Sequence, residues 1–214
     1  MVAMTVVIID YGSGNLRSAE KAFKHVAEPK GQRIRVTGNA EEVKAADCII
    51  LPGVGSFSDC KKGVESLSGM RESLEVAVIE RGVPFLGICV GMQLMARFGY
   101  ENGEHEGFGW IESEVIPLKA YKNLKIPHMG WNDLSIHSKN HPVMSGIPAG
   151  VHAYFVHSFF MKCKTQSEIL ASVNYGESLC AVVGRANMIG TQFHPEKSQT
   201  VGLQFISNFL KWKP

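Results

Sequence analysis

The sequence predicts an α/β protein with a mostly parallel central sheet that is flanked by helices and extended by antiparallel strands in the C-terminal half. Up to Gly99, short apolar segments alternate with amphipathic segments, which is typical of a parallel sheet with helices on both faces. After Gly99, strand-like segments follow one another with turn residues and few helix signals between them. Because no linker, repeat or low-complexity segment interrupts the 214 residues, we expect a single domain over residues 1–214.

The first half of the chain is expected to build the parallel part of the sheet. Residues 5–10 are apolar and mostly β-branched, as in a strand buried on both faces, and a turn-rich loop follows. A helix is then expected from the helical spacing of Leu16, Ala19, Ala22, Phe23 and Val26. The further elements expected here are strands at 32–37, 47–51 and 83–88 and helices at about 56–67, 70–81 and 91–98. A few residues precede the first strand, and we assign them no role.

The second half is expected to be rich in strands and to close with a helix. The strands are expected around residues 114–118, 125–136, 151–162, 169–173, 179–185 and 188–193. Residues 199–212 carry an apolar stripe at helical spacing, formed by Leu203, Ile206, Phe209 and Leu210. These strands are expected to add antiparallel neighbours to the central sheet or to form a small side sheet.

The composition favours a globular protein without a nucleic-acid or membrane partner. Hydrophobic residues make up 45% of the sequence, enough for a sizeable core, and the net charge is only +2. The first ten residues hold an apolar run too short for a signal peptide or a membrane span. An odd number of cysteines, five, without a signal peptide fits a reducing cytosol, so we expect a cytoplasmic location. Zinc-site spacing, the dinucleotide pattern and the P-loop do not occur, so we expect no metal and no cofactor.

Cys89 has the surroundings of an enzyme nucleophile. It is the third residue of Gly-Ile-Cys-Val-Gly, where an apolar strand is expected to meet a helix. A nucleophile elbow needs small residues two positions before and after the nucleophile, because the backbone turns sharply there. The helix N-terminus then favours the thiolate over the thiol. The alternative is a buried structural cysteine, which is the role that we expect for Cys48, Cys60, Cys163 and Cys180.

His194 and Glu196 are candidates for the base and the group that orients it. His194 follows an apolar strand, and in an extended segment the side chain two residues later points the same way. Glu196 could therefore accept a hydrogen bond from the imidazole and fix its tautomer. A His-Pro-Glu sequence alone is equally compatible with a surface turn. Together with the Cys89 elbow, it indicates a triad.

Attack on an amide carbonyl also requires hydrogen-bond donors for the oxyanion. Pro-Gly-Val-Gly at residues 52–55 follows a buried strand, and its glycines allow backbone N–H groups, such as that of Val54, to turn towards a ligand. The N–H group of Val90, next after the nucleophile, is a second candidate donor. Taken alone, the Pro-Gly-Val-Gly segment is more typical of a plain strand-to-helix turn.

These motifs resemble those of the class I, or triad, glutamine amidotransferases. The resemblance rests on residues 84–93, Pro-Phe-Leu-Gly-Ile-Cys-Val-Gly-Met-Gln, together with His194-Pro195-Glu196. Four further segments are similar to the glutaminase subunits of imidazole glycerol phosphate synthase. They are Asp-Tyr-Gly-Ser-Gly-Asn-Leu-Arg at 10–17, Pro-Gly-Val-Gly-Ser-Phe at 52–57, Pro-His-Met-Gly-Trp-Asn at 127–132 and Tyr-Phe-Val-His-Ser at 154–158. The resemblance covers nearly the whole chain.

The resemblance implies a role for each matching residue. Cys89 would form a γ-glutamyl thioester and release ammonia from glutamine, with His194 as base and then acid and Glu196 as its orienting group. The residues that would hold the glutamine are Gly53, Gly91, Gln93, His157, Ser158 and Phe159. The segment 53–55 would be misoriented in the resting state. Asn15, Trp131 and Lys197 would face a partner subunit, although a half-buried Trp131 in the core is an equally good interpretation of its sequence surroundings.

The partner that the resemblance implies is a cyclase subunit with a (β/α)₈ barrel, bound as a heterodimer. It would combine the ammonia with a phosphoribulosyl-formimino nucleotide to make imidazole glycerol phosphate for histidine synthesis.

Two positions depart from the family, which commonly has Tyr at the position of Phe159 and Leu at the position of Val90. The alternatives are a glutaminase serving anthranilate or pyridoxal phosphate synthase, a hydrolase of other γ-glutamyl substrates and a non-catalytic scaffold.

Overall fold

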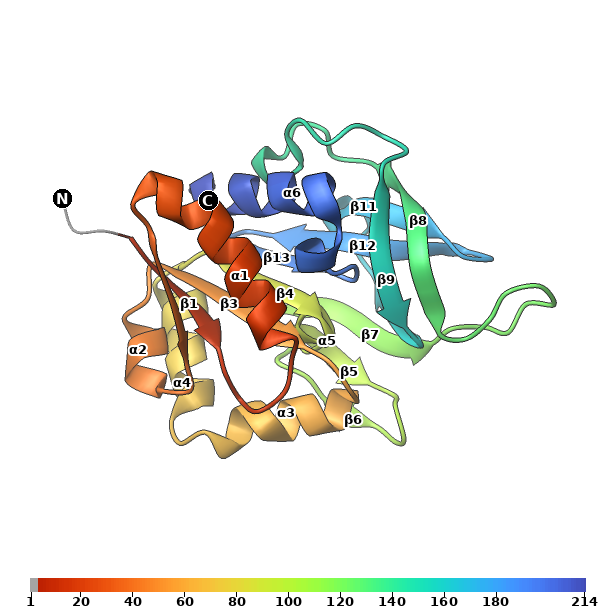
Figure 1. The fold of residues 1–214 in the computed structure, drawn as a ribbon. Coiled ribbons are helices and arrows are strands. Elements are labelled where there is room, and N and C mark those ends of the chain that lie inside the picture. The colour runs from red at the N-terminus through yellow and green to blue at the C-terminus, as the bar shows by residue number, and fades with distance from the viewer. Residues whose placement is uncertain (1–3) are drawn as a thin grey trace.

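A computed structural model describes residues 4–214, so residues 1–3 of the N-terminal segment without an assigned role lie outside the described part. Within this part the chain forms a nine-stranded sheet in the order β2-β1-β3-β4-β13-β12-β11-β8-β9 and a four-stranded sheet in the order β10-β7-β5-β6 (Figure 1). The strands of the larger sheet are β1 (Thr5–Ile9), β2 (Arg33–Thr37), β3 (Cys48–Gly53), β4 (Phe85–Cys89), β8 (His128–Ile136), β9 (His152–His157), β11 (Ile169–Asn174), β12 (Ser178–Arg185) and β13 (Met188–Thr191). The smaller sheet consists of β5 (Ala96–Gly99), β6 (His105–Glu106), β7 (Ile111–Pro117) and β10 (Phe159–Cys163).

The predicted α/β class and its division into two halves are confirmed. From β2 to β13 the neighbouring strands of the large sheet run parallel. From β13 to β9 they run antiparallel. Strands β1, β3 and β4 are apolar, buried runs, which suits a sheet covered on both faces, whereas the edge strand β2 carries exposed arginines.

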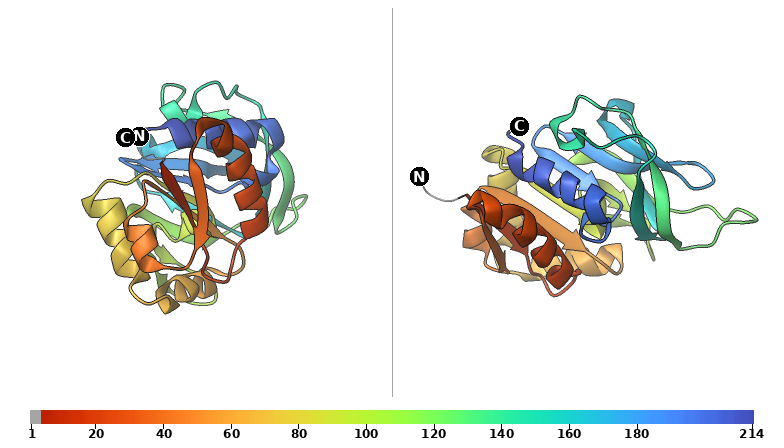
Figure 2. Two further views of the ribbon diagram at one scale, coloured as in Figure 1. Left: turned by 60° about the vertical axis from the view of Figure 1, so that its left-hand side comes forward. Right: turned by 45° about the horizontal axis from the view of Figure 1, so that its top comes forward.

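Helices cover both faces of the parallel strands. They are α1 (Leu16–Ala27), α2 (Ala40–Lys44), α3 (Phe57–Ser66), α4 (Met70–Leu74), α5 (Val90–Gln93) and α6 (Gln199–Lys211), with a π-helix at Glu75–Glu80 and a short 3₁₀ helix, η5, at Pro195–Lys197. Helices α1 and α6 pack together on one face, and α2, α3 and α4 lie on the other (Figures 1 and 2). The segment between β7 and β8 projects away from the body of the molecule (Figure 1).

The helix expected at residues 91–98 is wrong beyond its first turn. Helix α5 ends at Gln93, and the chain continues as strand β5. The segment that follows β6 takes the carbonyl groups that a longer helix would use, since the N–H groups of Gly107 and Phe108 donate to Arg97 and Leu94. Because this pairing is tertiary, the helical spacing of the methionines in the segment did not reveal it.

Two further expectations are corrected. The single strand expected at 151–162 is divided at Ser158 into β9 and β10, which belong to different sheets. Helix α2 was not anticipated; it begins at Asn39, whose side chain accepts hydrogen bonds from the N–H groups of Glu41 and Glu42. The break at Ser158 matters most, because it turns the chain past the carboxyl end of β4.

Candidate active site

Cys89 ends β4 in a strained backbone conformation, with φ 54° and ψ −111°. Residues other than glycine rarely adopt a positive φ, and such strain is concentrated at functional sites. A side chain at Gly87 would place its Cβ 2.5 Å from the Gly91 carbonyl oxygen, and one at Gly91 would place its Cβ 1.8 Å from the Leu51 carbonyl oxygen. The two glycines are therefore required sterically, as the elbow interpretation predicts.

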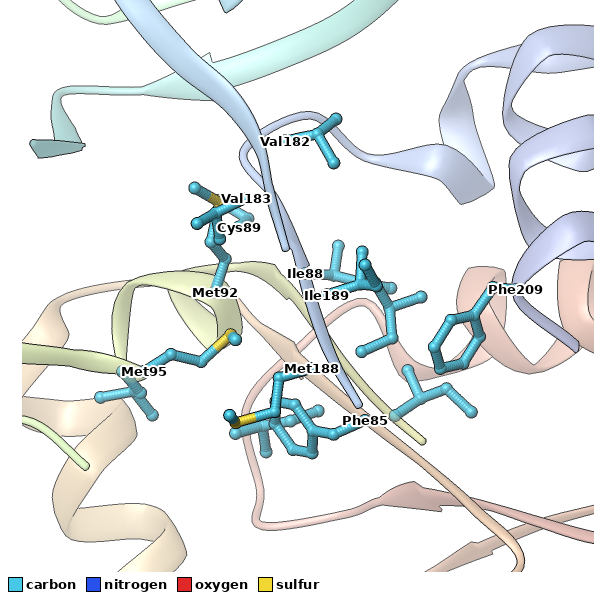
Figure 3. Close-up of a cluster of buried hydrophobic side chains, with 14 of the residues drawn as sticks. Phe85, Ile88, Cys89, Met92, Met95, Val182, Val183, Met188, Ile189 and Phe209 are labelled. Carbon is cyan, nitrogen blue, oxygen red and sulfur yellow. The ribbon is translucent and has the colours of Figure 1, made fainter. Parts of the chain in front are cut away.

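The Cys89 side chain is only 4% exposed. Figure 3 shows it with Ile88, Met92 and Val183 in the apolar cluster around β4 and β13. Its Sγ lies 3.9 Å from the Val156 carbonyl oxygen and 3.6 Å from Nε2 of Gln192. The sulfur thus has an acceptor on one side and an amide donor on the other.

His194 and Glu196 form the predicted pair. Nδ1 of His194 lies 2.8 Å from Oε1 of Glu196, which fixes the ring in its pocket, and the His194 residue is only 1% exposed. Nε2 of His194 is buried without a hydrogen-bond partner among residues 4–214. Burial alone lowers the pKa of His194, but the Cys89 and Glu196 side chains favour the charged ring and raise this pKa to about 10. His194 can therefore hold a proton beside Cys89.

The Pro-Gly-Val-Gly segment lies directly beside the elbow, because Gly53 pairs with Cys89 across β3 and β4. Its carbonyl groups are held by side chains from elsewhere in the chain. Tyr11 Oη donates to the Pro52 carbonyl at 2.8 Å, and Ser13 Oγ donates to the Val54 carbonyl at 2.6 Å. The orientation of this strand end is consequently set by the loop that follows β1.

A cavity of about 270 Å³ opens at the elbow. Its lining comprises Val54, Gly55, Cys89, Val90, Gln93, Glu101, Pro127, Val156, His157, Ser158, Phe159 and His194. Most of the residues predicted to bind the substrate or stabilise the oxyanion are therefore brought together. Gly53 and Gly91 are not in the lining. They lie behind it, where a Cβ at Gly53 would be 2.6 Å from the Gly91 nitrogen. Because neither residue has a side chain, β3 can approach the elbow closely.

The carbonyl group of Phe159 anchors the segment 157–159 at the cavity wall. It accepts hydrogen bonds from Nε2 of Gln93 at 3.0 Å and from Nδ1 of His157 at 2.9 Å. Both hydrogens of the Gln93 amide are used, because Nε2 also donates to Oε1 of Gln192 at 3.1 Å. Gln93 is left with its own oxygen as the group that it can offer to a ligand.

A second chain of hydrogen bonds runs from His157 to β8. Because a carbonyl only accepts, Nδ1 of His157 carries the proton and Nε2 is an acceptor. Nδ1 of His128 lies 2.9 Å from that acceptor, and Nε2 of His128 lies 3.2 Å from Nδ2 of Asn132. Burial lowers the pKa of His157 to about 3 and that of His128 to about 4. Both rings are therefore neutral at pH 7.

Two of the predicted interface residues lie on the surface formed by β8, β9 and η5. Trp131 is 46% exposed and Met129 is 63% exposed, which excludes a core position for this Trp. The Trp131 ring packs edge-on against Tyr154 at 5.9 Å, and Nζ of Lys197 lies 5.7 Å from the same tyrosine ring. Asn15 precedes α1, where its side chain makes no capping hydrogen bond.

Several residues at the site were not predicted from the sequence. Gln192, Glu101, Pro127, Val156 and His128 all line the cavity or contact a residue that does. Gln192 left a signal, since it is a polar residue inside the apolar run 188–193 and lies two positions before His194. Pro127, His128 and Val156 lie in two of the segments that resemble known glutaminase subunits, but their local spacing does not predict contact with the cavity, and Glu101 left no signal. Their place depends on how β8, β9 and the loop after β5 meet.

Among residues 4–214 no three or more His, Cys, Asp or Glu side chains gather in a way that could hold a metal ion. In the same part of the chain, no helix is long and apolar enough to cross a membrane.

The sequence matches the family described as Glutamine amidotransferase class-I over residues 7–212. It is 53% identical to the imidazole glycerol phosphate synthase subunit HisH of Brucella melitensis, an alignment that covers 99% of this chain and all of that protein. It is 51% identical to the protein of the same name from Cereibacter sphaeroides, again over 99% of this chain and all of the relative. A crystal structure titled glutamine amidotransferase superposes with a TM-score of 0.71 at 20% identity, covering 96% of this chain and 97% of the other.

Proposed function

The chain belongs to the class I glutamine amidotransferases, and on this basis we infer that it is the glutaminase subunit of an imidazole glycerol phosphate synthase. The observation that carries the inference is the identity of about half of all positions, over the full chain, to proteins with that name. The buried Cys89, His194 and Glu196 at one cavity support the same conclusion, because a scaffold without catalytic activity has no need of a strained cysteine beside a paired histidine.

In the proposed first step, the Cys89 sulfur attacks the side-chain carbonyl carbon of glutamine. Its proton passes to His194, whose charged form is favoured by Glu196. The carbonyl π electrons move to oxygen, and the N–H groups of Val54 and Val90 would stabilise that oxyanion. When the oxyanion collapses, the C–N bond breaks, His194 gives its proton to the departing nitrogen, and ammonia leaves a γ-glutamyl thioester on Cys89.

In the second step, water attacks the thioester while His194 takes one of its protons. Collapse of this second oxyanion breaks the C–S bond, releases glutamate and returns the sulfur as a thiolate. Glu196 keeps Nε2 of His194 directed at the reacting atoms throughout, because Nδ1 stays bonded to its carboxylate.

Gln93 and the segment 157–159 would hold the glutamine. Because both amide hydrogens of Gln93 are bonded within the protein, its oxygen is suited to the α-ammonium group of the substrate. His157 and Ser158 also line the cavity, and the backbone of their segment is fixed through the Phe159 carbonyl. Gly53 and Gly91 would act indirectly by allowing the close packing that forms the cavity floor.

A subunit of a synthase requires a partner, and we propose that this partner is a (β/α)₈-barrel cyclase bound as a heterodimer. The surface that carries Met129 and Trp131 adjoins the cavity, because Met129 pairs with Val156 and Val156 is in the lining. Lys197 lies on the same surface, and Asn15 would extend it along α1. A partner docked there would receive ammonia directly. We further propose a single domain and a cytoplasmic location.

The test is glutaminase activity of the purified chain, alone and with the cyclase and its nucleotide ligand. We expect very slow hydrolysis by the isolated chain and a large acceleration in the complex. Full activity of the isolated chain without response to the partner would contradict the coupling. Cys89→Ala should abolish hydrolysis while leaving partner affinity intact, and residual turnover by this variant would show that Cys89 is not the nucleophile.

A further inference from the structure

The amide of Gln192 is buried against Cys89, the predicted nucleophile, and contacts Gln93, yet Gln192 itself has no role in the proposed hydrolysis. The side chain is 0% exposed, at the end of β13 and two residues before His194. We propose that Gln192 is a further catalytic residue, which donates an N–H hydrogen bond to the Cys89 sulfur and stabilises it as the thiolate. The proposal rests on the proposed function only in taking Cys89 as the reacting group.

The direction of this hydrogen bond follows from a series of hydrogen bonds that begins at the Phe159 carbonyl. A backbone carbonyl only accepts, so the atom of the Gln93 amide that lies 3.0 Å away is the nitrogen. That nitrogen donates its other hydrogen to the Gln192 amide at 3.1 Å, which makes the contacting atom of Gln192 its oxygen. The Gln192 nitrogen is therefore the atom that lies 3.6 Å from the Cys89 sulfur.

The opposite orientation of the Gln192 amide is excluded by the same contacts. It would place two NH₂ groups against each other and set a carbonyl oxygen against the sulfur, where it would repel a thiolate. A buried NH₂ group also requires an acceptor, and the sulfur is the acceptor that the structure provides. In this series of hydrogen bonds, every donor therefore meets an acceptor only when Gln192 donates to Cys89.

A hydrogen bond to an ionised acceptor is stronger than one to its neutral form, so the N–H group favours the thiolate over the thiol. At neutral pH this raises the fraction of Cys89 that is ready to attack. The same N–H group meets the sulfur again when the thioester is hydrolysed. The C–S electron pair then returns to sulfur, and a donor at that position makes the thiolate a better leaving group.

Other titratable groups also act on the sulfur and must stay unchanged in a test. They are His194 before η5, Tyr11 after β1 and Cys60 on α3. His157 on β9 and Glu101 line the same cavity and must also stay unchanged. Gln192 itself carries no charge. Replacing it by an uncharged residue therefore changes the hydrogen bond without changing this set of charges.

The test is the rate at which iodoacetamide alkylates Cys89 as a function of pH, followed by mass spectrometry of the peptide that contains it. Gln192→Met keeps the length of the side chain and removes the donor. We expect the midpoint of the rate profile to rise by about one pH unit, which is about a tenfold slower reaction at neutral pH. Gln204→Met is the matched control, since it removes an exposed glutamine hydrogen bond on α6 and should leave the profile unchanged. Coincident profiles of Gln192→Met and the wild type would overturn the proposal.

A second measurement applies to the wild-type chain, so that failure of Gln192→Met to fold does not leave the proposal undecided. The side-chain amide protons of Gln192 should shift in NMR spectra as Cys89 ionises, and this response should disappear in Cys89→Ser. Chemical shifts of these amide protons that stay constant while Cys89 ionises would refute the hydrogen bond. Neither experiment uses glutamine, so a chain that failed to hydrolyse glutamine would refute the proposed function and leave this result standing.

Discussion

Replacing His128 by glutamine is expected to make the fold less sensitive to acid. His128 is buried between two aromatic rings, with its ring centroid 4.8 Å from that of Phe155 and 3.9 Å from that of Tyr175. Its Nδ1 donates a hydrogen bond to His157, and its Nε2 accepts one from Asn132. Protonation of His128 would put a hydrogen on Nε2, the nitrogen that accepts from Asn132, and so set two donors against each other. Glutamine has an N–H donor and an oxygen acceptor for the same two partners and does not titrate.

The size of the acid-induced loss of stability follows from the pKa of His128, which burial lowers from its ordinary value of 6.5 to about 4. Between these two pH values His128 is protonated in the unfolded chain but not in the folded chain, so the free energy of unfolding falls as the pH decreases from 6.5 towards 4. At about 1.4 kcal/mol per pH unit, this single group costs about 2.5 kcal/mol at pH 4.5 relative to neutral pH. That is a substantial part of the ~5–15 kcal/mol by which a typical domain is stable.

The assay is urea unfolding of the wild type and His128→Gln at pH 7.5 and pH 4.5. Carboxylates and His194 contribute to the acid dependence of both proteins. Subtracting the variant's loss of stability from that of the wild type therefore leaves the contribution of His128 together with its coupling to His157, the ring that it contacts. We expect the variant to lose about 2.5 kcal/mol less on acidification than the wild type, although packing loss makes it less stable at neutral pH. His25→Gln, at an exposed position of α1, is the control and should follow the wild type. Equal losses in His128→Gln and the wild type would show that the ring is not held neutral.

Three more outcomes are expected. Glu196→Gln should lower kcat by about 10²–10⁴-fold with little change in KM, because the imidazole loses the carboxylate that orients and charges it; unchanged kcat in steady-state assays would rule out the triad. Gly91→Ala should destabilise the chain by more than about 3 kcal/mol in thermal unfolding, since its Cβ would overlap the Leu51 carbonyl. Trp131→Ala should weaken binding of the partner by about 2 kcal/mol or more in calorimetry, and an unaltered Kd would place the interface elsewhere.

The elbow at Cys89 and the pairing of His194 with Glu196 could be predicted because their signals are local. A glycine two residues on either side of Cys89 marks a backbone that must turn sharply, and the structure shows that neither glycine accepts a Cβ. His194 and Glu196 are two residues apart in an extended segment, so their contact depends on strand geometry alone. The resemblance to known glutaminases added the substrate and the partner.

The errors arose where pairing between distant segments overrode a local pattern. Residues 94–99 have helical spacing, but their carbonyl groups pair with the chain after β6, and this produces β5 in place of a longer helix. Residues 151–162 read as one strand, but they are divided between two sheets at Ser158. Propensity is a weak prior wherever a neighbouring strand can satisfy the backbone instead.

The sequence by itself determined the α/β class, through the alternation of strands and helices along the chain. It also singled out the Cys89 elbow and the His194–Glu196 pair, because each of these two motifs depends on residues within a few positions of one another. Only the tertiary structure decided what surrounds them. Gln192 meets Cys89 across a separation of 103 residues, and His128 meets His157 across 29. Hydrogen bonds of this kind depend on strand order and register, which short-range spacing does not specify.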